Sequence, residues 1–391
     1  MVVQRAPSRP ALEVADVFRA HGEAYRQAHS LTGDQGKVMR AIEACRTAVL
    51  GGHVDFCLDC GTKTPSYNSC RNRHCPKCQG LEQAAWIEAR KARTLPTHHF
   101  HVVFTIPAQL RSLAKANQEV VYSILFREAS RTLLELGETR LGATLGVTEV
   151  LHTWTRTLAY HPHVHCIVTG GGLALDGTRW VSTSKRYLFP VKILSRLFRG
   201  KVLAALQQAH AAGDLKIAAP DFALLIAPLY HKDWVAYAKQ PFGSATHVFE
   251  YLGRYTHRVG ISNQRLLGMD ERGVRFLTKG GHSECLPPSE FIRRFLQHVL
   301  PSGFVKIRHY GLLAPANVNT KLPIALRLMS PPPSPPSPPP PPVETSLVPT
   351  SPEMPTWEER LLALTGIDVR TCRHCGSSHL ELRPLSDLDT G

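Results

Sequence analysis

The sequence predicts an α+β protein with a cysteine-rich N-terminal domain, a larger domain built on an antiparallel sheet flanked by helices, and a proline-rich linker to a small C-terminal tail. Three observations lead to this prediction. Two Cys-x-x-Cys pairs lie within residues 57–78, strand and helix patterns are mixed from residue 97 to residue 328, and residues 331–342 are almost entirely proline. We therefore expect a helical, metal-binding domain over residues 1–96, the α+β domain over 97–328, the linker over 329–352 and the tail over 353–391.

The composition indicates a globular protein that binds a polyanion. Of its 391 residues 43% are hydrophobic, and the formal net charge is +15. A positive field attracts phosphate backbones, and no apolar run approaches the roughly 18 residues that span a bilayer. The first ten residues lack the apolar segment of a secretory signal. We therefore expect a nucleic-acid partner, no membrane association and a reducing cytoplasm, in which the ten cysteines need an explanation other than disulfides.

The N-terminal domain is expected to begin with two short helices between residues 11 and 50, where apolar residues such as Val14, Val17 and Phe18 recur at helical spacing. The cysteine-rich segment follows. A stretch rich in Ala, Glu, Lys and Arg over residues 79–95 predicts a further helix, which Pro96 ends.

The larger domain is expected to alternate between strands and helices. Residues 98–106 predict a strand and residues 110–141 one or two helices, and 147–155 and 163–169 predict neighbouring strands followed by turns at 170–172 and 176–177. A helix over 191–212, a strand over 234–239 and a helix over 245–258 that Ser244 caps come next. Residues 261–267 and 274–278 predict a hairpin, and 290–300 a last helix.

The two cysteine pairs predict a structural zinc site. Cys57 and Cys60 form one pair and Cys75 and Cys78 the other, which is close to the spacing at which four thiolates enclose tetrahedral zinc. Two further candidates, Cys70 and His74, lie between the pairs, so that other ligand sets stay open. We expect the site to present its basic neighbours to DNA, namely Lys63, Arg71, Arg73 and Lys77.

A histidine pair predicts a second, catalytic metal site. His163 and His165 lie at i and i+2 of a strand and therefore share one face, while Val164 points to the other. Two imidazoles leave open positions for phosphate oxygens on Mg²⁺ or Mn²⁺. The similar pair His99 and His101 opens a run that is typical of a buried strand. A third protein ligand is expected but stays unassigned among four candidates: Glu149, His152, His161 and His247.

Two tyrosines lie one turn apart in the predicted helix 245–258. Tyr251 and Tyr255 are at i and i+4, so both phenols can reach the same phosphate. Together with Val248 and Leu252 they also fit the spacing of an ordinary buried stripe. The spacing alone therefore leaves a structural role open.

Four motifs in order along the chain resemble the two-tyrosine HUH transposases of the insertion-sequence 91 family. They are Ser69-Cys-Arg-Asn-Arg-His-Cys-Pro-Lys-Cys78, His161-Pro-His-Val-His-Cys-Ile-Val168 before a glycine run, Lys239-Gln-Pro-Phe242 with Tyr251-Leu-Gly-Arg-Tyr-Thr-His-Arg-Val259, and Phe304-Val-Lys-Ile-Arg-His-Tyr-Gly-Leu-Leu313. The resemblance implies an HUH-type catalytic domain in which His163 and His165 hold the cation and Tyr251 and Tyr255 are nucleophiles.

This resemblance also implies the reaction and its partners. A tyrosine would cleave and rejoin single-stranded DNA through a 5′-phosphotyrosine during rolling-circle transposition of a bacterial element. Partners would be single-stranded or hairpin element ends, target DNA and host replication factors, in a nucleoid-associated cytoplasmic protein. The expected phosphate contacts are Lys239, Arg254 and Arg258, in addition to Arg71 and Arg73.

Two alternatives remain at this stage. A replication initiator or relaxase of the HUH type would share the histidines and tyrosine chemistry, and a zinc-containing DNA-binding protein without catalysis would use both sets of residues structurally. The chain departs from the family pattern in its long proline linker and in its tail. In the tail Cys372 and Cys375 supply half of a zinc site, which His374 or His379 could complete.

Overall fold

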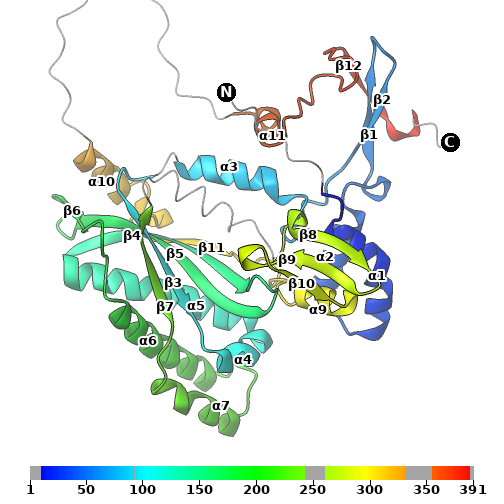
Figure 1. Cartoon of the computed structure of the whole chain (residues 1–391). Helices are drawn as coiled ribbons and strands as arrows, with labels where there is room; N and C mark the ends of the chain where they lie inside the picture. Colours follow the sequence, from blue (N-terminus) through cyan, green and yellow to red (C-terminus); the bar gives the residue numbers. More distant parts are fainter. Residues whose placement is uncertain (1–9, 92–93, 243–259, 331–354, 388–391) are drawn as a thin grey trace, which may run out of the picture.

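The computed structural model describes residues 10–91, 94–242, 260–330 and 355–387, which form a mixed α/β structure with three antiparallel sheets (Figure 1). The helices are α1 Val14–Ala28, α2 Gly33–Ala44, α3 Gln79–Lys91, α4 Arg111–Ala116, α5 Gln118–Leu136, α6 Val191–Ala211, α7 Ala219–Ile226, α9 Pro288–Leu296, α10 Lys321–Met329 and α11 Trp357–Thr365. Across the described ranges, none of these helices combines the length and the apolar character that crossing a bilayer requires.

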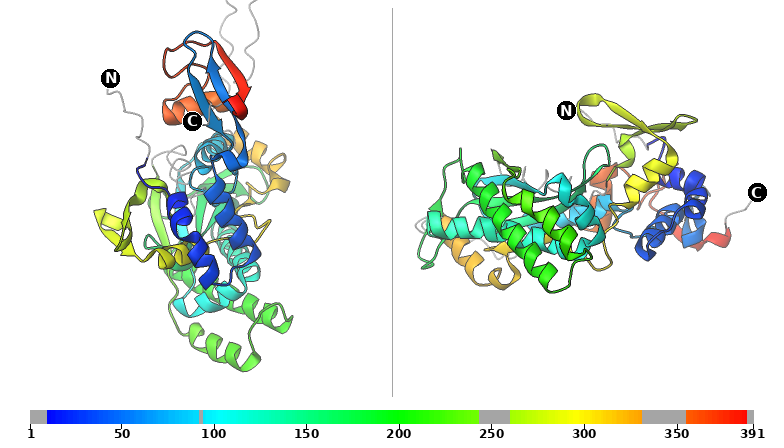
Figure 2. Two further views of the ribbon diagram at one scale, coloured as in Figure 1. Left: turned by 90° about the vertical axis from the view of Figure 1, so that its right-hand side faces the viewer. Right: turned by 90° about the horizontal axis from the view of Figure 1, so that it is seen from below.

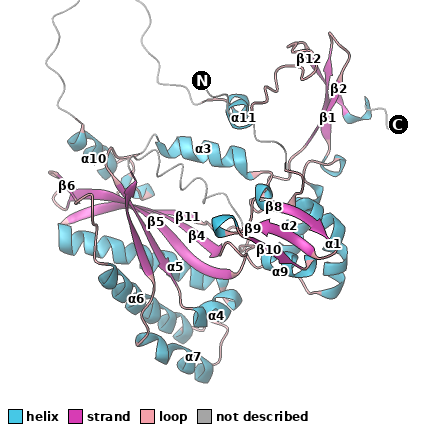
Figure 3. Cartoon of the chain, in the orientation of Figure 1, coloured by secondary structure: helices cyan, strands magenta, loops and turns pink. Residues whose placement is uncertain are grey.

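The strands belong to one large and two small sheets (Figure 3). The large sheet has the order β11-β4-β5-β3-β7, with β6 paired to one end of β5, and each small sheet has three strands, in the orders β12-β1-β2 and β10-β9-β8. The strands are β1 Gly52–Cys57, β2 Lys63–Tyr67, β3 His99–Thr105, β4 Ala143–Trp154, β5 Tyr160–Ala174, β6 Trp180–Ser182, β7 Ala236–Phe242, β8 Leu266–Asp270, β9 Gly273–Leu277, β10 Ser283–Leu286, β11 Ile307–Gly311 and β12 Leu380–Pro384.

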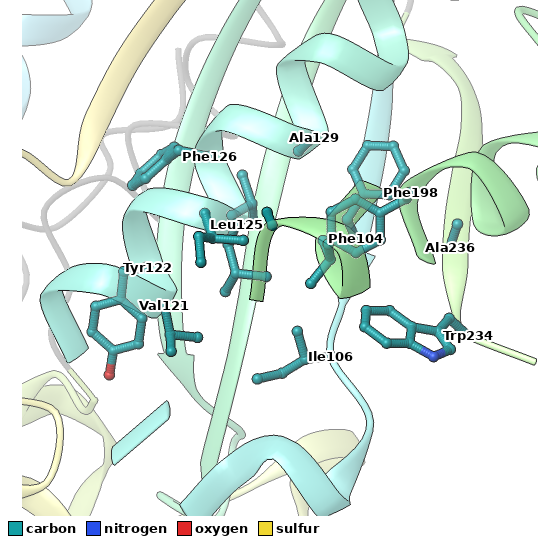
Figure 4. Close-up of a cluster of buried hydrophobic side chains, with 14 of the residues drawn as sticks. Phe104, Ile106, Val121, Tyr122, Leu125, Phe126, Ala129, Phe198, Trp234 and Ala236 are labelled. Atoms are coloured by element: carbon teal, nitrogen blue, oxygen red, sulfur yellow. The ribbon is translucent and has the colours of Figure 1, made fainter. Parts of the chain in front are cut away.

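One face of the large sheet is covered by α5 and α6, which pack the main hydrophobic core against it (Figure 4). Alternate residues of the strands point into this core, as Phe104 of β3 does when its ring meets Phe198 of α6 with the centroids 4.6 Å apart. Leu125 and Phe126 of α5 are also fully buried there. The remaining residues of each strand therefore face the opposite side of the sheet.

The N-terminal helices pack against elements from the C-terminal part of the larger domain. Val17 and Phe18 of α1 share a core with Phe291 and Phe295 of α9 and with the sheet β10-β9-β8. The rings of Phe18 and Phe295 meet edge to face at 5.3 Å. The contacts thus cross the expected boundary near residue 96, and the proposed domain limits remain a prediction.

The third sheet joins the two ends of the described chain. Strand β12 of the tail pairs with β1 in antiparallel register from His53–Pro384 to Cys57–Leu380. Figure 2 shows the tail beside the β1–β2 hairpin. Helix α11 also reaches α3, because the Arg360 guanidinium lies 2.9 Å from the Glu88 carboxylate.

Most of the predicted elements are present, with differences that have a local cause. The glycine run 170–172 lies inside β5 rather than in a turn, because β4 and β6 approach its backbone so closely that a Cβ at Gly171 or Gly172 would clash with their carbonyl groups. Asp176 and Gly177 do form the expected turn. The unexpected elements are helices α7, α10 and α11 and strands β1, β2, β6, β10, β11 and β12. The predicted helix 245–258 lies outside the described residues.

Candidate functional site

The face of the large sheet opposite its core carries a group of histidines. In β5, Val164 is fully buried in the core, so its neighbours His163 and His165 point to the other face. The register pairs His152 of β4 with His163 and thus puts it on the same face. Apolar neighbours on this face, Val150 and Ile167, are covered by α3.

Three of these histidines converge on one point. Ligand atoms of His152, His163 and His165 all lie within 4.8 Å of one another. The ring of His152 lies 4.3 Å from that of His165 and 5.4 Å from that of His163, between centroids. Imidazoles at these separations can bind one cation from one side and leave the other side open to phosphate.

The charge states favour metal binding, because imidazole binds metal only when neutral. Burial lowers the pKa of His163 to about 4. Burial and then the neighbouring His152 hold the pKa of His165 well below its usual range. The Nδ1–H of His163 donates to the carbonyl of His161 at 2.6 Å, which directs Nε2 toward the cluster.

His101 belongs to this group, which differs from its interpretation as a plain core residue. Phe100 and Val102 fill the core, so His101 faces the histidine cluster, and its Nε2 lies 2.7 Å from Nδ1 of His165. The two rings are stacked with centroids 5.0 Å apart. His101 therefore orients a histidine of the cluster through a hydrogen bond. The alternation of His99-Phe-His101-Val was the available signal in the sequence.

The remaining candidates for a third ligand lie elsewhere. Glu149 points to the core face, where the Cys166 thiol donates to its Oε1 at 3.6 Å, and burial raises its pKa well above the usual range. His161 accepts from the Arg111 guanidinium at 3.1 Å. His247 lies outside the described residues. Among the candidates that are described, His152 alone shares the cluster.

The cysteines form two groups of four, which corrects the expected single site from Cys57, Cys60, Cys75 and Cys78. The first group has ligand atoms within 4.8 Å and consists of Cys45, Cys70, Cys75 and Cys78. The second, equally compact, consists of Cys57, Cys60, Cys372 and Cys375. Each predicted Cys-x-x-Cys pair thus contributes to a different group.

In the first group, Cys45 caps the C-terminus of α2 and its sulfur lies 3.5 Å from that of Cys78. The Cys70 sulfur lies 3.6 Å from that of Cys78, so the loop 70–78 brings its own cysteines together with Cys45. His74 is not part of the group, because its Nε2 accepts from the backbone N–H of Leu300 at 3.2 Å. Sequence reasoning missed Cys45 because it has no second cysteine at the Cys-x-x-Cys spacing.

The basic residues expected at DNA are in different environments. Arg71 is exposed, whereas the Arg73 guanidinium donates to the carbonyl groups of Pro301, at 2.7 Å, and Phe304. Burial lowers the pKa of Arg73. Lys77 forms an ion pair with Glu13. Arg73 and Lys77 therefore hold the protein together instead of facing solvent.

The residues expected at the cleaved phosphate are described only in part. Lys239 lies in β7, whose backbone pairs it with His101 of β3. Tyr251, Tyr255, Arg254 and Arg258 lie outside the described residues. Only 8 residues separate Phe242, the last residue of β7, from Tyr251.

Comparisons with known proteins match both parts of the chain. Residues 146–321 match the family described as "Putative transposase", and residues 17–106 match the family described as "Transposase zinc-binding domain". The chain is 42% identical over 404 residues to "Putative transposase y4qJ" of Sinorhizobium fredii, with 98% of each chain covered. It is 29% identical over 309 residues to "Transposase for insertion sequence element IS801" of Pseudomonas savastanoi, with 74% of each covered.

No solved structure matches the chain. The zinc-binding match includes Cys45, Cys70, Cys75 and Cys78 and ends far before the tail. The transposase match includes all three clustered histidines. With two family models and a relative over nearly its whole length in agreement, the chain belongs to the insertion-sequence 91 family of transposases.

Proposed function

We propose that the protein cleaves and rejoins single-stranded DNA at the ends of its element by tyrosine transesterification, in rolling-circle transposition. The observation that carries this proposal is the convergence of His152, His163 and His165 on the face of the sheet opposite its core. The substrates would be single-stranded or hairpin element ends and target DNA, and host replication factors would assist.

The histidine cluster fits a catalytic Mg²⁺ or Mn²⁺. Its donors are imidazoles from two adjacent strands, held within 4.8 Å, and burial lowers the pKa of His163 and of His165. Three protein ligands leave coordination positions for phosphate oxygens, and such a donor set suits Mn²⁺ better than Mg²⁺. When bound, the cation would polarise the phosphate that is attacked.

Tyr251 and Tyr255 are the proposed nucleophiles. A phenol oxygen would attack the phosphorus, forming a tyrosine–phosphate bond to the 5′ side while the 3′ oxygen leaves and takes up the phenol proton. The reverse attack by a 3′ hydroxyl would release the tyrosine and join the strands, so no external energy source is consumed. Two tyrosines allow one cleaved end to be held while the second phenol acts.

The position of the tyrosine segment in the chain supports this assignment. β7 lies next to β3, which contributes His101, and β3 lies next to β5, which contributes His163 and His165. The tyrosine segment begins a few residues after β7, within reach of the cluster. Arg254 and Arg258 in the same segment would bind flanking phosphates.

The test is formation of a covalent adduct. Full-length protein is incubated with end-labelled single-stranded DNA from an element terminus and Mg²⁺ or Mn²⁺, and resolved on a denaturing gel. We expect a protein–DNA band that is absent in Tyr251→Phe/Tyr255→Phe and after chelation. Tyr237→Phe, a tyrosine of β7 that precedes the family motif, is the matched control and should retain the band.

Absence of the adduct with both metals, or its persistence in the double phenylalanine variant, would refute the proposed chemistry. The second outcome would also favour another nucleophile. If the unmodified protein never forms the adduct, and it and the double phenylalanine variant bind the DNA with equal affinity, the zinc-containing DNA-binding protein considered above would be the better description. A replication initiator would form the adduct on a plasmid origin and not on element ends.

A further inference from the structure

The second cysteine group is built from two matching loops far apart in the sequence. Cys57 and Cys60 flank one loop, which Gly61 follows, and Cys372 and Cys375 flank the other, which Gly376 follows. In each loop the glycine N–H donates to the carbonyl of the first cysteine, at 2.9 Å and 2.8 Å. Both glycines have a positive φ, 71° and 79°.

The matching continues around each loop. The N–H of Cys57 donates to the carbonyl of Thr62 at 3.0 Å, and the N–H of Cys372 donates to that of Ser377 at 2.7 Å. In the second loop the N–H of His374 also points at the Cys372 sulfur, at 3.4 Å. Such tight turns, with amide groups directed at sulfur, bring two thiolates to one side as a metal requires.

The distances between the sulfurs suit a tetrahedral metal. The Cys57 and Cys375 sulfurs are 3.6 Å apart, and those of Cys60 and Cys372 are 3.7 Å apart. Four sulfurs at about 2.3 Å from a central zinc lie about 3.8 Å from one another in a tetrahedron. A disulfide would need about 2.05 Å. The geometry therefore fits a shared ion between the loops.

The tail is attached to this region by contacts that do not depend on the cysteines. β12 pairs with β1 along its length, and the N–H of Leu58 donates to the carbonyl of His379 at 3.0 Å. The Arg383 guanidinium lies 3.6 Å from the centroid of the Phe56 ring. Asp59 and His379 are paired at 3.2 Å. Because the group already contains four cysteines, it needs neither His374 nor His379 as a ligand.

We propose that Cys57, Cys60, Cys372 and Cys375 bind a second structural Zn²⁺, which fastens the C-terminal tail to the N-terminal module. All four positions are filled by thiolates, so the ion is closed to water and has no catalytic role. The site cannot form from the N-terminal domain alone, because half of its ligands lie more than 300 residues away. It is independent of the strand-transfer chemistry proposed above.

The test is the zinc content of full-length variants, measured by elemental analysis together with iron. Cys372→Ser/Cys375→Ser should contain one equivalent of zinc less than the unmodified protein, and so should Cys57→Ser/Cys60→Ser. Combining all four substitutions should remove no more than that one equivalent. Cys45→Ser/Cys78→Ser should lose a different equivalent, so that its loss adds to the first.

Cys285→Ser is the matched control, because this exposed cysteine lies outside both groups and should keep the full zinc content. Unchanged zinc in the Cys372→Ser/Cys375→Ser variant, or iron in its place, would overturn the proposal. Cobalt titration of the unmodified protein serves if a variant does not fold. Two equivalents with tetrathiolate spectra support the second site, and a single one refutes it.

Discussion

Replacing His152 by alanine is the most direct test of the histidine cluster. It removes one of three converging imidazoles and leaves His163 and His165 in place. Loss of a hydrogen-bond partner behind a metal ligand weakens binding by about 10–100-fold, so loss of a ligand should exceed this range. We expect the metal concentration that half-saturates adduct formation to rise at least about 100-fold, which corresponds to about 2.7 kcal/mol.

The assay is a Mn²⁺ titration of adduct formation on single-stranded DNA, with the zinc content measured in parallel. His101→Ala should give a smaller rise, about 10–100-fold, because His101 acts through its 2.7 Å contact with His165. His99→Ala is the control, because its Nδ1 lies 3.0 Å from the carbonyl of Thr97 and it lies outside the cluster. Equal rises for His99→Ala and His152→Ala, at unchanged melting temperature, would refute the assignment.

Four other substitutions test the rest of the structure. Cys45→Ser should lose one equivalent of zinc and have a lower melting temperature, since zinc binding contributes about 10–16 kcal/mol in isolated zinc modules. Elemental analysis measures the zinc content of the variant. Full retention of zinc would contradict the first cysteine group. Arg73→Ala should lower the free energy of unfolding, measured by urea titration, by about 1.5–3 kcal/mol and leave the salt dependence of DNA binding unchanged. Arg71→Ala should instead reduce the slope of the logarithm of the DNA-binding constant against the logarithm of salt concentration by about 0.7–0.9. Glu149→Gln should flatten the pH dependence of stability, because burial raises the pKa of this carboxyl in the folded protein. The proton on Glu149 stabilises the fold fully below the pKa of the unfolded chain, about 4.3. As the pH rises from there toward the pKa of the folded state, the free energy of unfolding falls by up to about 1.4 kcal/mol per pH unit. Urea titrations between pH 5.5 and 8 measure the free energy of unfolding of the unmodified protein and of Glu149→Gln. Equal slopes of this free energy against pH for the two proteins would contradict the reasoning.

The sequence was sufficient to predict a site where its residues recur at short spacing along one helix or strand. The pair His163 and His165 was predictable because alternation in a strand puts both on one face. The same alternation in His99-Phe-His101 was available, but the following apolar run favoured a core strand. Since Phe100 and Val102 point into the core, His101 between them faces the cluster.

The sequence was insufficient where ligands come from distant segments. Cys45 is separated from Cys70 by the whole β1–β2 hairpin, and Cys57 from Cys372 by most of the chain. Two Cys-x-x-Cys pairs in one segment predict that both pairs bind the same metal ion. The fold instead uses each pair with a different partner, because β1 carries Cys57 toward β12 and away from Cys75.

The contacts of the first cysteine group give a physical reason for a zinc-binding domain in the same chain as the transposase domain. The loop 70–78 holds the segment before β11, through Arg73 on the carbonyl of Pro301 and His74 on the N–H of Leu300. That segment continues into β11, and just before the strand the carbonyl of Lys306 accepts from the N–H of Leu151 at 3.0 Å.

Leu151 directly precedes His152 in β4, so the loop 70–78 supports the strand that contributes the third histidine. β11 has five residues and lies at the edge of the sheet, where it pairs with β4 alone among the described strands. Helix α3, which follows the loop, packs Trp86 and Ile87 over Val150 and Ile167 on the histidine face. Zinc binding at the first group should therefore set the geometry of the histidine cluster although it takes no part in the chemistry.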